Sequence, residues 1–297
     1  MYDRILIPVD GSDEATHAAR RGLELARTCD ATVSVLHVVE QKSLRLTEAV
    51  EEKTRLREQG ETVLEDIAEL TSEFDQPVTR VLTEGEPAVQ ISDAASERNT
   101  DLIVIGRQGM TGLGKRLLGG VTEQVLRRSD VPVFVVPEGD PVSGTHSGYS
   151  RILVPTDGSD NTDAAIPHGA PMARHFDSTI HVLNVVDLQA AGGVFSAGGL
   201  ETEFVQRLEA RGREAVTEVA DEISEVAPDV DVKTSVERTT SHGGVPVGVR
   251  EYVEESNIDM VVMGTRGRSN LERQLFGSVA STVLRTVDVP ILVVKPD

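Results

Sequence analysis

Short apolar runs rich in isoleucine and valine alternate with longer segments of helical periodicity along this chain of 297 residues. In the first half, the predicted strands are 3–9, 32–39, 77–83, 101–106 and 131–137, with a helix between each pair. Runs such as 102–105 are apolar at every position, which is typical of parallel strands covered by helices on both faces. The pattern therefore predicts an open α/β sheet built from a β-α-β-α-β-α-β-α-β unit.

The second half of the chain repeats this pattern. The matched segments are 2–13 with 149–160 and 36–39 with 183–186, at an offset of 147, then 101–106 with 259–264 and 130–136 with 288–294, at an offset of 158. The second copy thus has eleven more residues before its glycine loop, and the Gly/Ala-rich run 190–199 is where we expect them. We predict two domains, 1–138 and 149–297, joined by a linker at 139–148.

Right-handed crossovers and the need to cover both faces favour the flavodoxin-like strand order 3-2-1-4-5 in each copy, while leaving other orders open. The predicted fold class is α/β, with two tandem doubly wound open sheets, mostly parallel, of five strands each. In this order, strands 1 and 4 are neighbours whose connections leave in opposite directions. Ligands bind in the crevice outside the carboxyl ends of such strands, so the loops after strands 1 and 4 form the candidate site.

An aspartate follows strand 1 in each copy, at Asp10 and at Asp157. A short carboxylate at this place can form a turn or cap a helix, but Ser12 and Ser159 already supply candidates for the cap. A carboxylate at the crevice could instead accept hydrogen bonds from an adenine amine or a ribose hydroxyl. We therefore predict that both aspartates contact a ligand.

Two spaced pairs of small residues follow strand 4 at the same spacing in each copy. They are Gly106, Gly109, Gly119 and Gly120 in the first copy, and Gly264, Gly267, Gly277 and Ser278 in the second. Glycines let the backbone approach a phosphate closely, and the helix that follows points free N–H groups at the anion. A single pair would indicate only a tight turn, whereas the repeated double pair indicates binding. Because Gly120 lacks the hydroxyl of Ser278, we expect weaker binding in the first copy.

With these loops, the chain resembles the universal stress protein family, as a tandem member of its ATP-binding branch. The resemblance covers both halves nearly end to end and rests on the G-x-x-G-x9-G-[S/T] pattern together with the strand-1 aspartate. It implies that ATP or another adenine nucleotide, with or without magnesium, is the cofactor. In the second copy, the resemblance implies that the nucleotide is held by Asp157, the backbone at Val185, Gly264, Gly267, Gly277 and Ser278. In the first copy, the corresponding positions are Asp10, Val38, Gly106, Gly109, Gly119 and the backbone N–H of Gly120.

The resemblance also implies that the last strand of each copy, 131–136 or 289–294, pairs edge to edge with the same strand of another domain. A regular apolar edge strand invites such a partner, and Pro132 and Pro290 limit how far the pairing extends. We expect the two copies to pair as an internal pseudo-dimer, and association into a homodimer stays open.

Composition narrows the class of protein. The net charge of −20 argues against binding to nucleic acid, and only five of the 29 cations are lysine, so the acidic surface is of a type that suits a salt-rich, halophilic cytoplasm. No run approaches the roughly eighteen apolar residues of a membrane span, and the N-terminus does not resemble a signal peptide. The N-terminal pattern leads us to expect a cytoplasmic protein. The seven histidines do not cluster and Cys29 has no cysteine partner, so we expect no metal site.

A nucleotide-binding stress-response or regulatory protein, whose bound state is the output, is the leading function. The alternative is an enzyme on the same fold, a slow ATPase or a nucleotidyl- or phosphotransferase. No H-x-G-H or Walker-type lysine motif is present, so we assign no catalytic residue and expect at most weak ATP hydrolysis. A phospho-acceptor receiver domain shares the strand order but needs an aspartate after strand 3, where this chain has Thr83-Glu84 and Thr239-Thr240.

Overall fold

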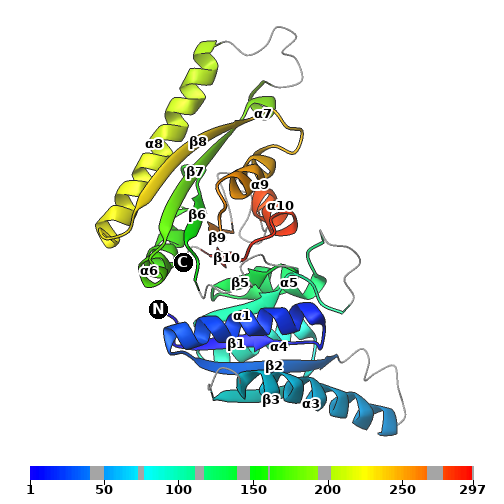
Figure 1. Cartoon of the computed structure of the whole chain (residues 1–297). Helices are drawn as coiled ribbons and strands as arrows, with labels where there is room; N and C mark the ends of the chain where they lie inside the picture. The colour runs from blue at the N-terminus through cyan, green and yellow to red at the C-terminus, as the bar shows by residue number, and fades with distance from the viewer. Residues whose placement is uncertain are drawn as a thin grey trace. The chain divides into compact units, whose positions relative to one another are not determined.

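The chain forms two compact units, Met1–Asp140 and Pro141–Asp297. The structure, a computed structural model, describes residues 1–40, 50–72, 77–110, 117–138, 148–159, 161–192, 202–265 and 277–295. Strands alternate with helices in both units (Figure 1), which confirms the predicted α/β class. Among the described helices, none is at once long enough and apolar enough to cross a bilayer.

The first unit is a parallel sheet in the order β3-β2-β1-β4-β5. Its elements are β1 (Arg4–Pro8), α1 (Asp13–Cys29), β2 (Thr32–Glu40), α3 (Val50–Ser72), β3 (Val78–Gly85), α4 (Pro87–Glu97), β4 (Leu102–Gly106), α5 (Gly120–Arg128) and β5 (Val133–Val136). Helix α1 packs beside α3, and α4 packs beside α5. Right-handed crossovers that run in opposite directions across the sheet place these two pairs on opposite faces.

The second unit has the equivalent order, β8-β7-β6-β9-β10, so the predicted 3-2-1-4-5 topology is confirmed in both. Its elements are β6 (Arg151–Pro155), the 3-10 helix η1 (Asp163–Ala165), α6 (Ile166–Phe176), β7 (Thr179–Asp187), α7 (Leu188–Gly192), α8 (Thr202–Val226), β8 (Val232–Thr239), α9 (Val245–Glu255), β9 (Met260–Gly264), α10 (Ser278–Thr286) and β10 (Ile291–Val294). Helix α7 covers the start of the Gly/Ala-rich run, and residues 193–199 of that run lie outside the described residues.

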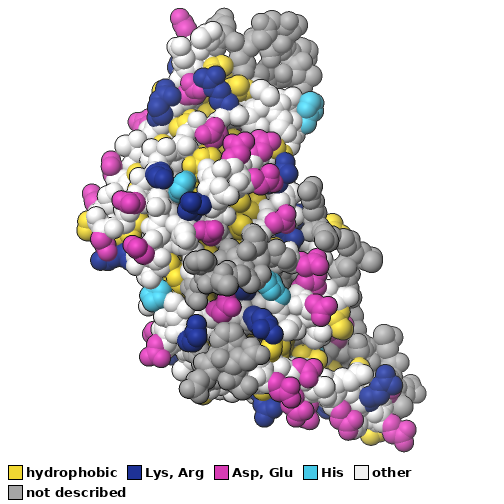
Figure 2. Space-filling model, in the orientation of Figure 1, with side chains coloured by type: hydrophobic (Ala, Val, Ile, Leu, Met, Phe, Trp, Pro, Cys, Tyr) yellow, Lys and Arg dark blue, Asp and Glu magenta, His cyan; other side chains and the backbone are white. Residues whose placement is uncertain are grey.

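The central strands carry the core of each unit. Leu102, Ile103 and Val104 of β4 have no exposed surface, as the unbroken apolar run predicts. Helix α1 lies close to the sheet because of Gly22, where an added Cβ would stand 2.7 Å from the Cδ1 atom of Ile7. On the face shown in Figure 2, acidic and basic side chains are interspersed, and no continuous basic patch is visible.

The side chain of His181 in β7 is buried, with only 6% of its surface exposed. Its Nδ1 atom lies 2.9 Å from the hydroxyl of Tyr252, and its Nε2 atom has no hydrogen-bond partner. Burial lowers the pKa of His181, and the positive charges of Lys233 and Arg151 lower it further. The fold therefore favours the neutral form of this imidazole.

Because the folded pKa lies below the unfolded value of about 6.5, the unfolded chain binds the proton first as the pH falls. We predict that the free energy of unfolding decreases as the pH drops below about 6.5. Urea titrations of the wild type and of His181→Gln between pH 7.5 and 5 measure this, and the variant should show a weaker pH dependence. Equal slopes would show that His181 does not contribute.

Candidate functional site

The aspartate after strand 1 closes the same turn in both units. The Oδ1 atom of Asp10 accepts hydrogen bonds from the N–H of Ser12 at 3.0 Å and from its hydroxyl at 2.6 Å. Ser12 in turn caps α1 by accepting from the N–H of Ala15 at 3.1 Å. In the second unit, Asp157 accepts from the N–H and hydroxyl of Ser159 at 3.1 and 2.6 Å. Ser12 thus caps α1 while Asp10 closes the turn before it.

The second oxygen of Asp10 joins the strand-1 loop to the glycine loop. Its Oδ2 atom accepts a hydrogen bond of 2.9 Å from the N–H of Met110, one hundred residues along the chain. Gly109 lies against the same oxygen, and an added Cβ at this glycine would overlap it. The structure therefore brings two of the predicted site residues, Asp10 and Gly109, into direct contact at the carboxyl ends of β1 and β4.

Gly106 and Gly264 end the two equivalent strands, β4 and β9. An added Cβ at Gly106 would stand 3.0 Å from the carbonyl oxygen of Gln108 and 3.3 Å from that of Glu14. At Gly264, it would stand 2.6 Å from the carbonyl oxygen of Asn161. Close packing against the strand-1 connection therefore excludes a Cβ at Gly264 and disfavours one at Gly106, whether or not a ligand is bound.

Gly119 and Gly277 are the N-caps of α5 and α10, and neither helix is capped by a side chain. The N–H of Gly119 donates to the carbonyl oxygen of Arg107 at 2.9 Å, and that of Gly277 donates to the carbonyl oxygen of Thr265 at 2.9 Å. Both glycines have φ near −60° and ψ near 140°, which any residue can adopt. Their backbone conformation therefore does not explain why both are glycine.

The residues that open these helices differ between the units. Gly120 is exposed, with no atom within 4 Å of an added Cβ, so the first unit has room for a side chain here. Ser278 is exposed at the equivalent place and begins α10. Gly267 lies outside the described residues.

Val38 and Val185 are half-buried positions of β2 and β7. An added Cβ at Gly248 of α9 would stand 2.6 Å from the Cγ1 atom of Val185, so α9 packs directly on this residue. The residue that precedes each valine, His37 or Asn184, forms a hydrogen bond with the backbone of the strand-1 loop. The valines themselves do not contact the glycine loops through any described hydrogen bond.

Two side chains hold the strand-1 loop against the neighbouring strand, and the sequence did not assign them this role. The Nδ1 atom of His37 lies 2.9 Å from the carbonyl oxygen of Val9, and the side-chain N–H of Asn184 donates to the carbonyl oxygen of Thr156 at 2.8 Å. Because a carbonyl oxygen only accepts, the Nδ1 atom of His37 carries the proton. Burial lowers the pKa of His37. His37 and Asn184 occupy equivalent positions of the repeat, and both side chains offer an N–H donor. This equivalence was the signal in the sequence that could have indicated their shared role.

Three other carboxylates act on Glu14, which lies in the first turn of α1. Burial raises the pKa of Glu14 above its usual value, and the nearby carboxylates of Glu138, Asp10 and Asp13 raise it further. Arg107, in the glycine loop, is buried, with 3% of its surface exposed. Among the described residues, no group of three or more His, Cys, Asp or Glu side chains could hold a metal ion.

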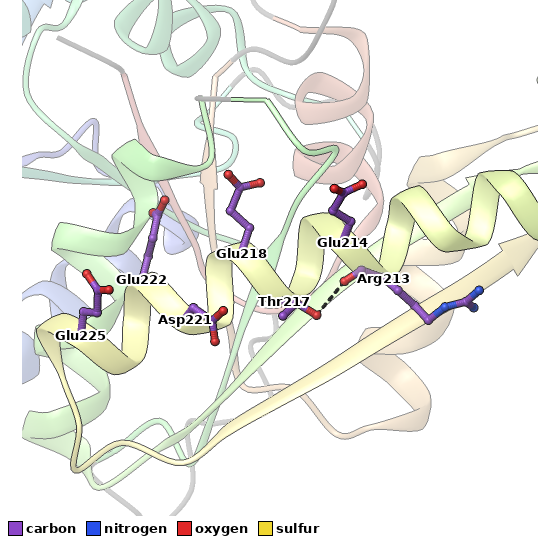
Figure 3. A pocket seen from close by; sticks show the side chains of 7 residues that line it. All are labelled: Arg213, Glu214, Thr217, Glu218, Asp221, Glu222 and Glu225. Atoms are coloured by element: carbon purple, nitrogen blue, oxygen red, sulfur yellow. Dashed lines mark hydrogen bonds between the residues drawn. The ribbon is translucent and has the colours of Figure 1, made fainter.

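Two grooves of the second unit lie away from these loops. One, of about 560 Å³, runs along α8 and is lined mostly by carboxylates (Figure 3), at Arg213, Glu214, Thr217, Glu218, Asp221, Glu222 and Glu225. The other, of about 420 Å³, lies between α6 and the end of α8. Neither groove contains a predicted site residue. The candidate site therefore rests on the loops at the carboxyl ends of the central strands.

This geometry defines a class of protein, the doubly wound α/β proteins, which generally bind their ligands at the topological switch point of the sheet. Solved structures share this fold. A crystal structure of a universal stress protein from Archaeoglobus fulgidus DSM 4304 superposes with a TM-score of 0.72 at 23% identity, covering 99% of this chain and 96% of that one.

Sequence comparison places the chain within a family. The pattern of the universal stress protein family matches residues 1–137 and again residues 148–295. A universal stress protein of Mycolicibacterium smegmatis is 28% identical over 306 residues, which cover 98% of this chain and 97% of that protein. Universal stress protein MJ0531 of Methanocaldococcus jannaschii is 36% identical over 148 residues, which cover 50% of this chain and 82% of that protein. The chain belongs to the universal stress protein family, as a tandem member.

Proposed function

We propose that each unit binds an adenine nucleotide in the crevice at the carboxyl ends of strands 1 and 4, and that the second unit binds ATP more tightly. The protein would act as a stress-response regulator whose bound state is its output. One observation carries the proposal: α5 and α10 begin at uncapped glycines, both hydrogen-bonded to the residue that follows the fourth strand of their sheet. First-turn N–H groups without a cap are free to bind a phosphate.

The proposed roles in the second unit follow from position. Gly264, Gly267 and Gly277 let the backbone approach the phosphates, and the hydroxyl of Ser278 is available as a further donor. Asp157 and the backbone at Val185 would contact the adenosine part, by analogy with the branch of the family that the sequence resembles. In the first unit, the corresponding residues are Asp10, Val38, Gly106, Gly109, Gly119 and Gly120.

Native mass spectrometry of the protein as purified, followed by calorimetric titration with ATP, tests the proposal. We expect adenine nucleotide to be carried through purification or bound on titration, with the two units differing in affinity. Incubation with ATP and magnesium should release little or no ADP. Absence of nucleotide binding in both measurements would refute the proposed function.

Gly120→Ser should strengthen binding in the first unit. The space around Gly120 admits a side chain, and serine would restore the hydroxyl found at Ser278. We expect a gain of several-fold in affinity for ATP, since a hydrogen bond contributes about 0.5–1.5 kcal/mol. The titration should be carried out on a chain in which the second site is disabled by Gly277→Val. Gly120→Ala is the matched control, because it adds the Cβ without the hydroxyl, and equal affinities of the two variants would contradict the role of the hydroxyl.

Two further features rest on the sequence and stay proposals. We propose that the last strands of the two copies, 131–136 and 289–294, pair with each other, and that the protein is cytoplasmic. Analytical ultracentrifugation would show whether two chains then associate.

A further inference from the structure

Helix α9 is fastened to β7 at two points. The hydroxyl of Tyr252 lies 2.9 Å from the Nδ1 atom of His181, and the two rings meet edge to face with their centroids 5.9 Å apart. One helical turn earlier, Gly248 packs against Val185. Residues four apart share one face of a strand and one face of a helix, so both contacts lie in the same interface. The contact at His181 therefore bears on how α9 lies over Val185.

The imidazole of His181 is poorly placed to take a second proton. Its side chain is buried, and its Nε2 atom has no hydrogen-bond partner. In the protonated ring both nitrogens carry an N–H group, so the Nδ1 atom can only donate to Tyr252 and the N–H at Nε2 has no acceptor. A buried charge with an unpaired donor is costly. Protonation therefore favours a state in which α9 moves away and the ring reaches water.

Positive charges face His181 from both neighbouring strands. Lys233 of β8 is its partner in register. Arg151 of β6 is the register partner of Thr179, which lies two residues before His181 on the same face. Burial lowers the pKa of His181, and these two charges lower it further. The surroundings therefore oppose a third positive charge at this place.

The acidic groups near this interface are engaged elsewhere or exposed. Asp259 accepts hydrogen bonds from the backbone N–H groups at the start of β6, at 2.8 and 2.9 Å. On α9, Glu254 pairs with Arg250 at 3.5 Å, and the other acidic residues of this helix, Glu251 and Glu255, are exposed. None of these carboxylates forms a described ion pair with His181.

The first unit has no such pair at the equivalent interface. Ser34 pairs in register with Leu6 as His181 does with Leu153, so the two positions are equivalent. Ala94 is the eighth residue of α4, as Tyr252 is of α9. Neither serine nor alanine titrates near neutral pH, so the first unit provides an internal control.

We propose that His181 and Tyr252 form a pH-sensitive latch, through which acidification weakens nucleotide binding by the second unit but not by the first. The inference rests on the proposed function, because Val185 is a proposed contact of the adenosine part. Helix α9 also packs beside α10, whose first turn holds the proposed phosphate donors. A shift of α9 therefore reaches both parts of the proposed site.

Calorimetric titration with ATP at pH 7.5 and at pH 5 tests the latch by comparing the wild type with His181→Gln. Glutamine can still form a hydrogen bond with Tyr252 but does not take up a proton in this range. We expect the tighter ATP site of the wild type to lose about tenfold more affinity on acidification than that of the variant, because binding that releases one proton weakens about tenfold per pH unit. The terminal phosphate of ATP also titrates in this range, and the comparison between the two proteins cancels its effect.

Two controls accompany this titration. His175→Gln removes an exposed histidine of the same unit and should follow the wild type. In a Gly277→Val chain, where only the first unit should bind ATP, His181→Gln should leave the pH dependence unchanged. If His181→Gln followed the wild type in the otherwise unaltered chain, the latch would be overturned with the proposed function intact. Failure of the wild type to bind ATP at pH 7.5 would instead refute the proposed function.

The movement of α9 can also be measured without any ligand. Hydrogen-exchange protection of the α9 amides should fall about tenfold between pH 7.5 and pH 5 in the wild type, and much less in His181→Gln. Helix α8 reports any loss of stability of the whole unit, because its Gly212 packs on Asn184, on the opposite face of β7 from Val185. Protection of α8 should fall less than that of α9. Equal losses in the two helices would show that protonation destabilises the whole unit, and would overturn the inference.

Discussion

Replacing Gly277 with valine should weaken ATP binding to the second unit by about a hundredfold, or about 2.7 kcal/mol. Gly277 precedes the first turn of α10, whose N–H groups are the proposed phosphate donors. Its φ of −60° and ψ of 141° are open to valine as well as to glycine. The added side chain would then exclude the phosphate, and loss of a hydrogen bond to a charged group costs about 1.5–3 kcal/mol.

Calorimetric titration with ATP measures this effect, and Thr286→Val is the matched control. It introduces the same side chain at the opposite end of the same helix, where Thr286 only donates to the carbonyl oxygen of Thr282. The control should bind ATP as the wild type does. If Gly277→Val also retained wild-type affinity, with its fold intact by circular dichroism, α10 would not form the phosphate site.

Replacing Leu6 with alanine should lower the free energy of unfolding by about 2–5 kcal/mol. Leu6 lies in β1, between β2 and β4, and has no exposed surface. Truncation removes apolar contacts and leaves a cavity that neighbours held in the sheet fill only in part. Urea unfolding monitored by circular dichroism measures the change.

Val50→Ala serves as the comparison, because Val50 is 78% exposed at the start of α3. It should change the free energy of unfolding by less than about 0.5 kcal/mol. Leu153→Ala repeats the test at the equivalent buried position of β6, where a loss as large as that of Leu6→Ala is expected. Similar stability of Leu6→Ala and Val50→Ala would show that β1 does not carry the core as the burial indicates.

The candidate site was partly accessible to sequence reasoning. The pattern at Asp10 and the spaced glycines placed two loops at the carboxyl ends of adjacent strands, and the structure brings Asp10 and Gly109 together there. The expectation that Asp10 faces a ligand stays untested, while its described hydrogen bonds go to Ser12 and Met110. A side chain's choice among several available partners depends on distances that residue types do not contain.

The sequence alone indicated the strands, the repeat and the family, and it favoured the 3-2-1-4-5 order without excluding others. Apolar periodicity is local, and the handedness of crossovers leaves few topologies for such a pattern. Only the tertiary structure decided which distant residues meet: Asp10 with Met110, His37 with Val9, and Glu14 with the turn at Gly106. These contacts join segments on different strands and helices, and they depend on how closely each helix packs on the sheet. That closeness follows from the whole core rather than from any single motif.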